Sequence, residues 1–520
     1  MKQFFKHLGA DIPAGLVVFL VALPLCLGVG LASTSVKGID GLPNIFSGII
    51  AGIIGGIVVG AFSGSKIGVS GPAAGLITII TGAIATLGSF DAFLVAVVIS
   101  GILQIVAGYA KLGILGNYFP SSVIKGMLAA IGITLILKEI PHAMGYDADF
   151  FGDEAFFQRD GENTFSELLK ATNAFNAGAV VVSLISLAIL ILFDRPIMKK
   201  IALFKLVPGA LIVVLVGVFL NLLFAKSFPG LYITKQHMVE LPVANSLSEF
   251  TSFFTLPDFS HLTNINVYII GATIALVGSL ETLLSVEATD NLDPSKHHTP
   301  TNRELKAQGI GNILSGMIGG LPVTQVIVRS SANAGAGGKS KLSAIFHGIL
   351  LLLSVLFIPR LINHIPLASL AAILIMVGYK LAKIELFKKM YRTGYEQFLP
   401  FIATIVGVLV TDLLKGIMIG IAVAIFYILR RNFRNNYSIN IDTESAGKTI
   451  RMELAEEVTF LNKASILEFF YEAEENSRII IDGTKCTSIN YDVLEAIQEF
   501  KEFGAPEKNI ELTLINISGI

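Results

Sequence analysis

Apolar residues occur along this chain in runs long enough to cross a lipid bilayer. A membrane-spanning helix needs about 20 consecutive, mostly apolar residues, and the chain contains many such runs. The pattern predicts fourteen segments, seven on each side of a long polar loop. The predicted segments are 12–32, 44–62, 67–87, 90–110, 117–138, 177–193, 204–224, 267–286, 305–320, 322–336, 341–358, 366–382, 396–411 and 413–430.

Glycine and proline interrupt two of these apolar regions, at Gly68–Gly75 and at Gly319–Asn333. Within a bilayer, irregular backbone is tolerated only where it is buried in protein or lines a wet cavity. Pro72 and Pro322 lie 250 positions apart, and paired interruptions in matching halves indicate a transporter's binding site. We therefore predict that the third and tenth segments are half-helices facing one central site.

The number of segments predicts that the two halves are inverted repeats. Seven segments per half require the second half to enter the membrane from the opposite side. Pro120 and Pro366, 246 positions apart, mark a second pair of matching points. The positive-inside rule then places both termini in the cytoplasm. The loops expected inside carry Lys66, Lys111, Arg195, Lys199, Lys200, Lys205, Lys296, Arg303, Lys306, Lys339, Lys341, Lys380, Lys383, Lys388, Lys389 and Arg392.

Composition narrows the class of protein. Hydrophobic residues make up 53% of the 520 positions and charged residues 15%, which predicts a polytopic α-helical membrane protein. A net charge of −1 without a basic stripe argues against a nucleic-acid partner. Two cysteines exclude a disulfide framework. Lys2 and Lys6 precede an apolar run that we interpret as the first retained span and not as a cleaved signal peptide.

The polar stretch after residue 435 has a different pattern. Short β-rich runs alternate with helical ones, which is typical of a small α/β domain. We therefore predict a transmembrane domain over 1–435 and a cytoplasmic α/β domain over 436–520. Its expected strands are 449–454, 478–482 and 511–515, and its expected helices are 463–473 and 491–503.

Glu281 is a charged residue inside the eighth apolar run. A charge near the bilayer centre costs roughly 2.5–3.5 kcal/mol, so such residues usually face a cavity or a partner. Gly278, Glu281 and Ser285 share one helical face. Oxygen ligands suit Na⁺, and a protonatable carboxylate could instead carry H⁺. The alternative is a structural glutamate bonded to a neighbouring helix.

Arg329 follows the interruption at Pro322 by two turns. A helix N-terminus carries about +0.5 charge, and an arginine beside it favours an anion. Alternatively, Arg329 pairs with a structural carboxylate such as Glu281. Two other motifs are excluded: Asn333–Ser340 lacks the first glycine of a phosphate loop and is predicted to be a helix end with a basic loop, and His297-His298 lacks metal-ligand spacing.

These residues resemble the SulP (SLC26-type) anion transporter family over essentially the whole chain. The resemblance is carried by Ala22-Leu-Pro24, Gly71-Pro72, Gly278-Ser-Leu-Glu-Thr-Leu-Leu-Ser285, Asn302-Arg-Glu-Leu305 with Gly309 and Gly311-Asn312, and Pro322-Val-Thr with Arg329-Ser330 and Asn333. The C-terminal stretch resembles a shortened STAS domain, with Ile481-Asp-Gly-Thr484 at its strand-to-loop turn. Tyr491 stands where soluble STAS regulators have a phosphorylated serine.

The resemblance implies a core of segments 1–4 and 8–11 that moves against a gate of segments 5–7 and 12–14, in a homodimer. It implies that the anion lies between the third and tenth half-helices. It places Na⁺, in some bicarbonate members, at Glu281 and Ser285, and implies no other cofactor. Leu25, where many sulfate members have Gln, favours bicarbonate, although those bicarbonate members have Asp at position 281. The implied substrate site comprises Gly71, Ala73, Ala74, Val328, Arg329, Ser330 and Leu25.

The resulting hypothesis is a plasma-membrane transporter of a small inorganic anion, with bicarbonate favoured over sulfate, driven by Na⁺ or H⁺ through Glu281. An uncoupled anion channel or an anion exchanger on the same fold is the alternative. A membrane-embedded enzyme or a scaffold is a third class, and the sequence offers no nucleophile–base pair, metal cluster or cofactor motif for an enzyme.

Overall fold

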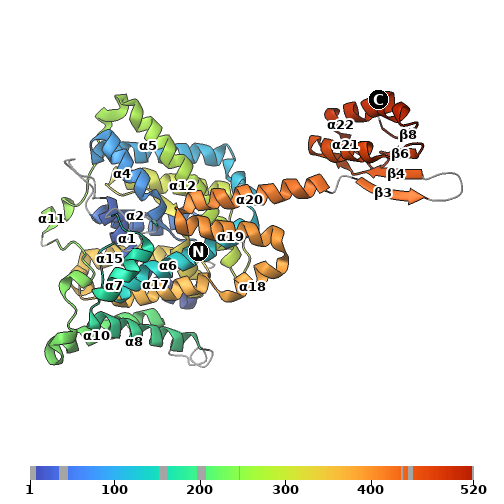
Figure 1. The fold of residues 1–520 in the computed structure, drawn as a ribbon. Coiled ribbons are helices and arrows are strands. Elements are labelled where there is room, and N and C mark those ends of the chain that lie inside the picture. Colours follow the sequence, from blue (N-terminus) through green and yellow to red (C-terminus); the bar gives the residue numbers. More distant parts are fainter. Residues whose placement is uncertain are drawn as a thin grey trace. The chain divides into compact units, whose positions relative to one another are not determined.

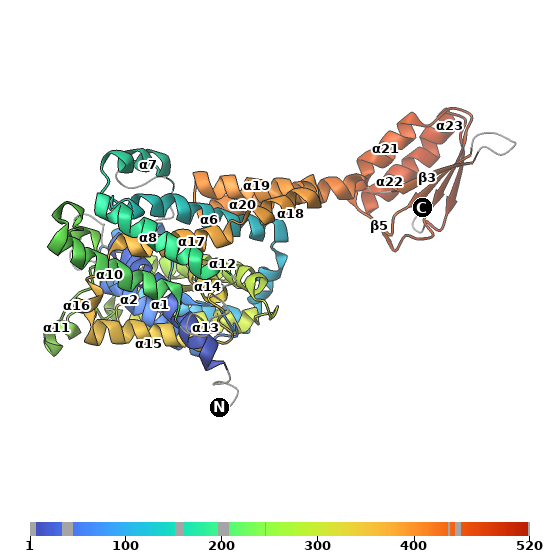
Figure 2. The same ribbon diagram turned by 90° about the horizontal axis from the view of Figure 1, so that it is seen from below.

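The computed structural model describes residues 7–33, 45–150, 156, 161–195, 207–244, 246–434, 437–442 and 449–517. Three lysines of the topology argument, Lys199, Lys200 and Lys205, lie outside the described residues, as do Lys2 and Lys6 of the N-terminal argument. The chain divides into two compact units, Met1–Ile421 and Ala422–Ile520. The first is helical, and the second combines strands with helices (Figures 1 and 2).

A helix, or a short strand followed by a helix, lies at each of the fourteen predicted segments. In the first half these are α1 (Leu8–Ser33), α2 (Phe46–Ile54) with η1 (Gly55–Val59) and α3 (Gly60–Phe62), β1 (Ser70–Pro72) with η2 (Ala74–Leu76) and α4 (Ile77–Leu87), α5 (Phe90–Tyr109), α6 (Ser121–Ala143), α8 (Ala177–Asp194) and α10 (Gly209–Ser227). In the second half they are α12 (Ile265–Leu292), α13 (Thr301–Met317), β2 (Val323–Gln325) with α14 (Ile327–Gly335), α15 (Leu342–Phe357), α17 (Leu367–Leu381), α19 (Tyr395–Val410) and α20 (Leu413–Arg434).

Seven helices among the described residues are long and apolar enough to cross a membrane by themselves, and four shorter helices are also apolar. Among the described residues, four helices that the apolar runs did not predict connect the segments. They are α7 (Thr164–Asn173), α11 (Leu247–Thr251), α16 (Pro359–Ile362) and α18 (Ile384–Thr393). All four are short, and the apolar-run criterion detects only segments of near-bilayer length.

Helix packing in the first unit follows a two-fold pattern. Helix α1 of the first half packs on α15, and the matching helix of the second half, α12, packs on α5. In the same way α5 packs on α13, and α15 packs on α2. The pair α6 and α17 packs together, with α19 on α6 and α8 on α17. This exchange of equivalent contacts is the packing expected of two inverted halves.

Small residues allow the closest of these contacts. A Cβ built on Gly48 of α2 would collide with the backbone carbonyl of Cys26 in α1, and one on Gly56 would stand 2.7 Å from Gly348 Cα in α15. Gly48 therefore lets α2 lie directly against α1, and Gly56 lets η1 lie directly against α15, as is typical of small residues at helix contacts in membranes.

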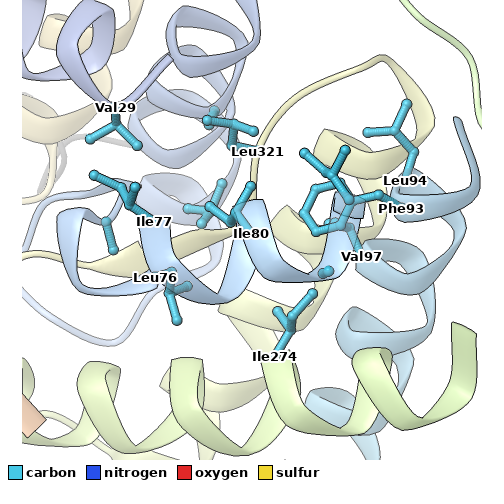
Figure 3. Close-up of a cluster of buried hydrophobic side chains, with 14 of the residues drawn as sticks. Val29, Leu76, Ile77, Ile80, Phe93, Leu94, Val97, Ile274 and Leu321 are labelled. Atoms are coloured by element: carbon cyan, nitrogen blue, oxygen red, sulfur yellow. The ribbon is translucent and has the colours of Figure 1, made fainter. Parts of the chain in front are cut away.

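A buried apolar cluster fixes the half-helix α4. Leu76, Ile77 and Ile80 pack against Phe93 of α5 and Ile274 of α12 (Figure 3). In a bilayer, close packing of such side chains stabilises helix association through van der Waals contact and not through removal of apolar surface from water. The cluster therefore packs the short helix against two long ones.

Asp11 of α1 fastens the loop that follows α14. Its carboxylate accepts hydrogen bonds from Lys339 N (2.7 Å), Ser340 N (3.0 Å) and Ser340 Oγ (2.5 Å). The phosphate-loop-like motif is thus a helix end and loop, as predicted, and its amides hold a protein carboxylate.

The second unit contains a four-stranded sheet in the order β3-β4-β6-β8. Strand β3 (Tyr437–Asp442) runs antiparallel to β4 (Thr449–Leu454), while β4, β6 (Arg478–Asp482) and β8 (Glu511–Ile515) are parallel. Helices α21 (Lys463–Glu472) and α22 (Tyr491–Glu499) cover one face of the sheet (Figure 1), with Phe470 and Phe500 stacked 4.1 Å apart. The three predicted strands and two predicted helices are present. Strand β3 and the short parallel pair β5 (Glu457–Val458) and β7 (Ser488–Ile489) were missed.

Candidate functional site

Strands β1 and β2 join the two interrupted segments in an antiparallel pair. Ser70 pairs with Gln325, Gly71 with Thr324, and Pro72 with Val323. Each strand leads directly into a short helix, α4 after β1 and α14 after β2. An antiparallel pair has a local two-fold axis, so the two helices leave it in opposite directions with their N-termini facing the same point.

The first turn of α14 has free backbone donors near this point. Ser330 N donates the first intrahelical bond, to Val326 O at 3.2 Å. The N–H groups of Ile327, Val328 and Arg329 precede it, and a helix leaves such groups without intrahelical acceptors. Together with the N-terminal dipole they form a region that favours negative charge.

Polar side chains from neighbouring helices hold the strand pair in place. Asn312 of α13 bonds both backbone groups of Val323, at 2.6 and 3.0 Å, and also Gln104 of α5. Gln325 donates its backbone N–H to Thr282 and its side-chain amide to Thr289, both on α12. These side chains satisfy backbone that a membrane could not, so the strands remain extended inside an otherwise helical unit.

A small cavity of about 30 Å³ lies at the meeting point of the helices. Its lining residues on the strand-associated helices are Ala74, Glu281, Leu284, Ser285, Val326, Ile327 and Val328, and its remaining lining residues are Met127, Ile131, Leu413 and Leu414. A cavity of this size has room for about two water molecules, so the site is nearly closed in this conformation.

Glu281 brings a buried carboxyl group to this cavity. Its side chain is 7% exposed. A Cβ built on Gly75, at the start of the other half-helix, would stand 3.2 Å from Glu281 Oε1. Ser285, one turn further along α12, is also buried and lines the cavity. The helical face predicted from Gly278, Glu281 and Ser285 therefore lies toward the strand pair, with Gly278 next to Thr324.

The side chain of Arg329 lies outside the cavity wall. Its side chain is 1% exposed, and its guanidinium lies against Gly71, where any Cβ would collide with it. Cys26 of α1 and His347 of α15 are close to the same guanidinium. Its Nε and Nη1 have no hydrogen-bond partner among the described residues. The charge thus lies behind the strand pair, on the side of α1 and α15.

The other substrate-site residues predicted from the sequence either line the cavity or pack outside its wall. Ala74 and Val328 line the cavity. Ala73 is 1% exposed and packs in the apolar cluster around Leu76. Ser330 Oγ accepts a bond from Val69 N (3.0 Å) and donates one to Val326 O (2.7 Å). Leu25 is buried in α1 and, with Gly71, Ala73, Arg329 and Ser330, lies outside the lining of the cavity.

Sequence reasoning missed the apolar lid of the cavity. Met127 and Ile131 come from α6, and Leu413 and Leu414 from the start of α20. Nothing distinguishes these residues from other apolar side chains in predicted spans. The break between the segments 396–411 and 413–430 was the one available signal, since it indicates a chain reversal near Leu413.

A second cavity, of about 390 Å³, follows the same helix faces away from the strand pair. Ser331 and Gly335 of α14 and Leu292 of α12 line it, as do Ile373 and Lys380 of α17. Ser331 and Gly335 continue the helical stripe that starts at Val328, and Leu292 continues that of Glu281 and Ser285. Both cavities therefore lie along one seam. Helices α12 and α14 form one side of this seam, and α6, α17 and α20 contribute to the other side.

Solved structures share this fold. The transmembrane domain of a cyanobacterial bicarbonate transporter, BicA, matches with a TM-score of 0.53 and 24% identity, covering 79% of this chain and 98% of that one. The structure of SLC26A9 matches with a TM-score of 0.63 and 15% identity, covering 100% of this chain and 85% of that one.

Sequence comparison identifies the family. A Bacillus subtilis (strain 168) protein, YvdB, whose description names sulfate transport, is 29% identical over 423 residues, 81% of this chain and 73% of the relative. The bicarbonate transporter BicA of Picosynechococcus sp. (strain ATCC 27264 / PCC 7002 / PR-6) is 24% identical over 465 residues, 88% of this chain and 76% of the relative. The model of the sulfate permease family matches residues 8–404. The chain therefore belongs to the sulfate permease family of membrane anion transporters.

Proposed function

We propose that this protein carries a small inorganic anion, bicarbonate in preference to sulfate, across the plasma membrane by alternating access. The observation that carries this proposal is the β1–β2 pair, which directs two helix N-termini toward a cavity that also contains Glu281. Two dipole ends of about +0.5 charge each attract an anion without a cationic side chain in the cavity wall. The anion is held by Ala74 and Val328 with the free amides at the start of α14, while Arg329 adds long-range positive potential.

Movement of α6 and α20 relative to α4, α12 and α14 opens the site. The lid residues Met127, Ile131, Leu413 and Leu414 leave about 30 Å³, too little for a polyatomic anion. The 390 Å³ cavity along the same seam is the access route to one membrane face. We assign α4, α12 and α14 to the moving core and α6 and α20 to the gate, within a transporter domain over 1–435 of a homodimer.

Glu281 couples anion transport to a cation. An ionised carboxylate in the cavity repels the anion, and Coulomb repulsion is strong where water is excluded. Binding of H⁺, or of Na⁺ between Glu281 and Ser285, removes that repulsion and raises anion affinity. By linkage the anion raises cation affinity by the same factor, which makes the two move together.

Two observations favour bicarbonate. By the family resemblance, Leu25 stands where many sulfate members have glutamine, and a BicA relative aligns over most of the chain. Sulfate remains the second candidate, because the relative YvdB is described by sulfate transport. Residues 436–520 act as a cytoplasmic STAS-like domain, and both termini lie in the cytoplasm.

Uptake by proteoliposomes tests this function. Labelled bicarbonate, sulfate and chloride are each supplied under an inward Na⁺ gradient, an inward H⁺ gradient, or none. We expect bicarbonate to accumulate under one of the two gradients. Glu281→Gln imitates the neutral carboxyl, so it should abolish gradient-driven accumulation while anion exchange persists. Glu287→Gln, on the same helix, is the control and should behave as wild type.

Two results would count against the proposal. Gradient-driven uptake that survives in Glu281→Gln removes this residue from the coupling mechanism. An anion current that is independent of both gradients in the wild-type protein would favour the uncoupled channel.

A further inference from the structure

A cluster of basic side chains lies where α6 and α18 meet. Lys388, Lys389 and Arg392 belong to α18, Lys383 is its N-cap residue, and Lys125 lies in the second turn of α6. We call these five residues the basic face. The only carboxylate within α18 is Glu385, one turn before Lys389.

The inner side of α18 is fixed by apolar packing. Met390 is 2% exposed, and it packs with Leu386 and Phe387 in a cluster that includes Ala129 of α6 and Phe401 of α19. The rings of Phe387 and Phe401 meet edge to face at 5.3 Å. Because this side is anchored, the orientation of the outer side is determined as well.

The outer side of α18 combines apolar and cationic side chains. Ile384 is 62% exposed and Tyr391 is 71% exposed. Lys388 and Arg392 follow Ile384 at intervals of four and eight residues, so they share its helical face. A short helix with exposed apolar residues among basic ones is typical of segments that lie in the membrane interface.

Within the part of the chain that the structure describes, no carboxylate neutralises the charges of the basic face. Among the described residues, none of the five takes part in an ion pair. Lys125 and Lys389 are also close enough for their charges to repel each other. Five cations held together without carboxylate partners favour an anionic ligand.

The position of α18 identifies that ligand. Only residues 382–383 separate it from the membrane helix α17, and only Gly394 separates it from α19. It therefore lies at the ends of two spans, at the bilayer surface. We propose that the basic face binds the phosphate headgroups of anionic phospholipids in the membrane around the protein, with Ile384 and Tyr391 inserted among the acyl chains.

Thermal unfolding of the full-length protein in detergent tests this proposal. Phosphatidylglycerol and phosphatidylcholine with the same acyl chains are titrated separately. We expect phosphatidylglycerol to raise the melting temperature at concentrations where phosphatidylcholine does not. A lysine near an anionic surface contributes about 1 kcal/mol, or about five-fold in affinity. Lys388→Gln/Lys389→Gln should therefore raise the phosphatidylglycerol concentration needed for half of the melting-temperature shift by roughly 25-fold.

The matched control is Lys226→Gln/Lys235→Gln, which also removes two exposed lysines from the membrane unit and should retain the wild-type response. A second variant, Ile384→Ser/Tyr391→Ser, should weaken the effect while keeping its dependence on salt. Equal stabilisation of the wild type by both lipids would overturn the proposal, as would an unchanged response in Lys388→Gln/Lys389→Gln.

The alternative to a lipid headgroup is that the acidic stretch after residue 435 binds the basic face. In that case phosphatidylglycerol would have no effect, and Lys388 and Lys389 would be protected from amine-labelling reagents until high salt released them. That pair of results would also overturn the lipid proposal.

Discussion

Ala73 and Ala74 are neighbours in the chain, but only Ala74 lines the cavity among the described residues. Both are small and both contact the cluster of Leu76 and Ile80, in which Ala73 is 1% exposed and Ala74 is only partly buried. Ala73 is one of the substrate-site residues implied by the family resemblance, and its side chain lies outside the lining of the cavity. A phenylalanine at 73 would overpack the core and would not test the site.

Ala74→Phe is the informative substitution. The ring is much larger than the cavity of about 30 Å³, so it should keep the anion out and also overpack the closed site. We expect uptake to fall at least ten-fold, together with a lower melting temperature. Ala85→Phe, at an exposed position of the same half-helix, should leave uptake unchanged. Normal uptake by Ala74→Phe would place the anion elsewhere.

Asp482 ends β6 and gives the C-terminal unit a pH dependence. Bonds from Thr484 Oγ1 (2.5 Å), from Arg451 and from Thr484 N (2.9 Å) lower the pKa of this carboxyl to about 2. A lowered pKa contributes stability that is fully present above the ordinary aspartate value of about 3.9 and is lost as pH falls toward about 2.

Asp482→Asn should therefore destabilise the C-terminal unit at pH 7, and the difference from wild type should shrink between pH 4 and pH 2. Hydrogen exchange of the amides in β6, measured across that range, checks this. The exposed Asp492→Asn should follow wild type throughout. A difference that stays constant with pH would mean that ionisation of Asp482 is not the cause.

At the scale of elements, the loop after α14 depends on α1. Asp11 is fully buried and accepts three hydrogen bonds from Lys339 and Ser340. A bond to a charged acceptor contributes about 1.5–3 kcal/mol. The carboxylate thus ties the end of one half-helix to the first span of the other half.

Asp11→Asn replaces one carboxylate oxygen by an amide group that cannot accept these bonds. We expect the unfolding free energy to fall by about 2–4 kcal/mol, measured by denaturant titration in mixed micelles. Asp194→Asn removes a half-exposed ion pair with Lys380 and should cost less than about 1 kcal/mol. Equal losses in both variants would contradict the role assigned to Asp11.

Much of the fold was predictable from sequence, because the length and position of apolar runs depend on the bilayer itself. The two interruptions were predictable for the same reason, since backbone breaks in lipid must be satisfied by protein. Strand β3 was overlooked although Tyr437, Ile439 and Ile441 alternate with polar residues. The direction of Arg329 was not predictable, because helical periodicity gives a face and not the neighbour that the face meets.

At the scale of the whole molecule, the two compact units can be tested separately for their part in transport. The contacts described for the cavity come from residues 74–414. The anion site should therefore survive without the C-terminal unit, while assembly or folding is weakened.

Deletion of residues 436–520 tests this expectation. Cross-linking in membranes should show fewer dimers and a lower protein yield, whereas anion binding to the purified monomer should change less than three-fold. Complete loss of anion binding by a well-folded deletion variant would show that the C-terminal unit helps to form the site.

The pairing of β1 with β2 also constrains how the protein is made. The strand of residues 70–72 pairs with residues 323–325. The ribosome must therefore add about 250 more residues before the backbone groups of the first interruption can form these hydrogen bonds. Until then, polar amides stand exposed inside the hydrocarbon layer. Nascent chains stalled before residue 323 should consequently be retained by the insertion machinery and degraded, and the substrate site should form late in biogenesis as a single event.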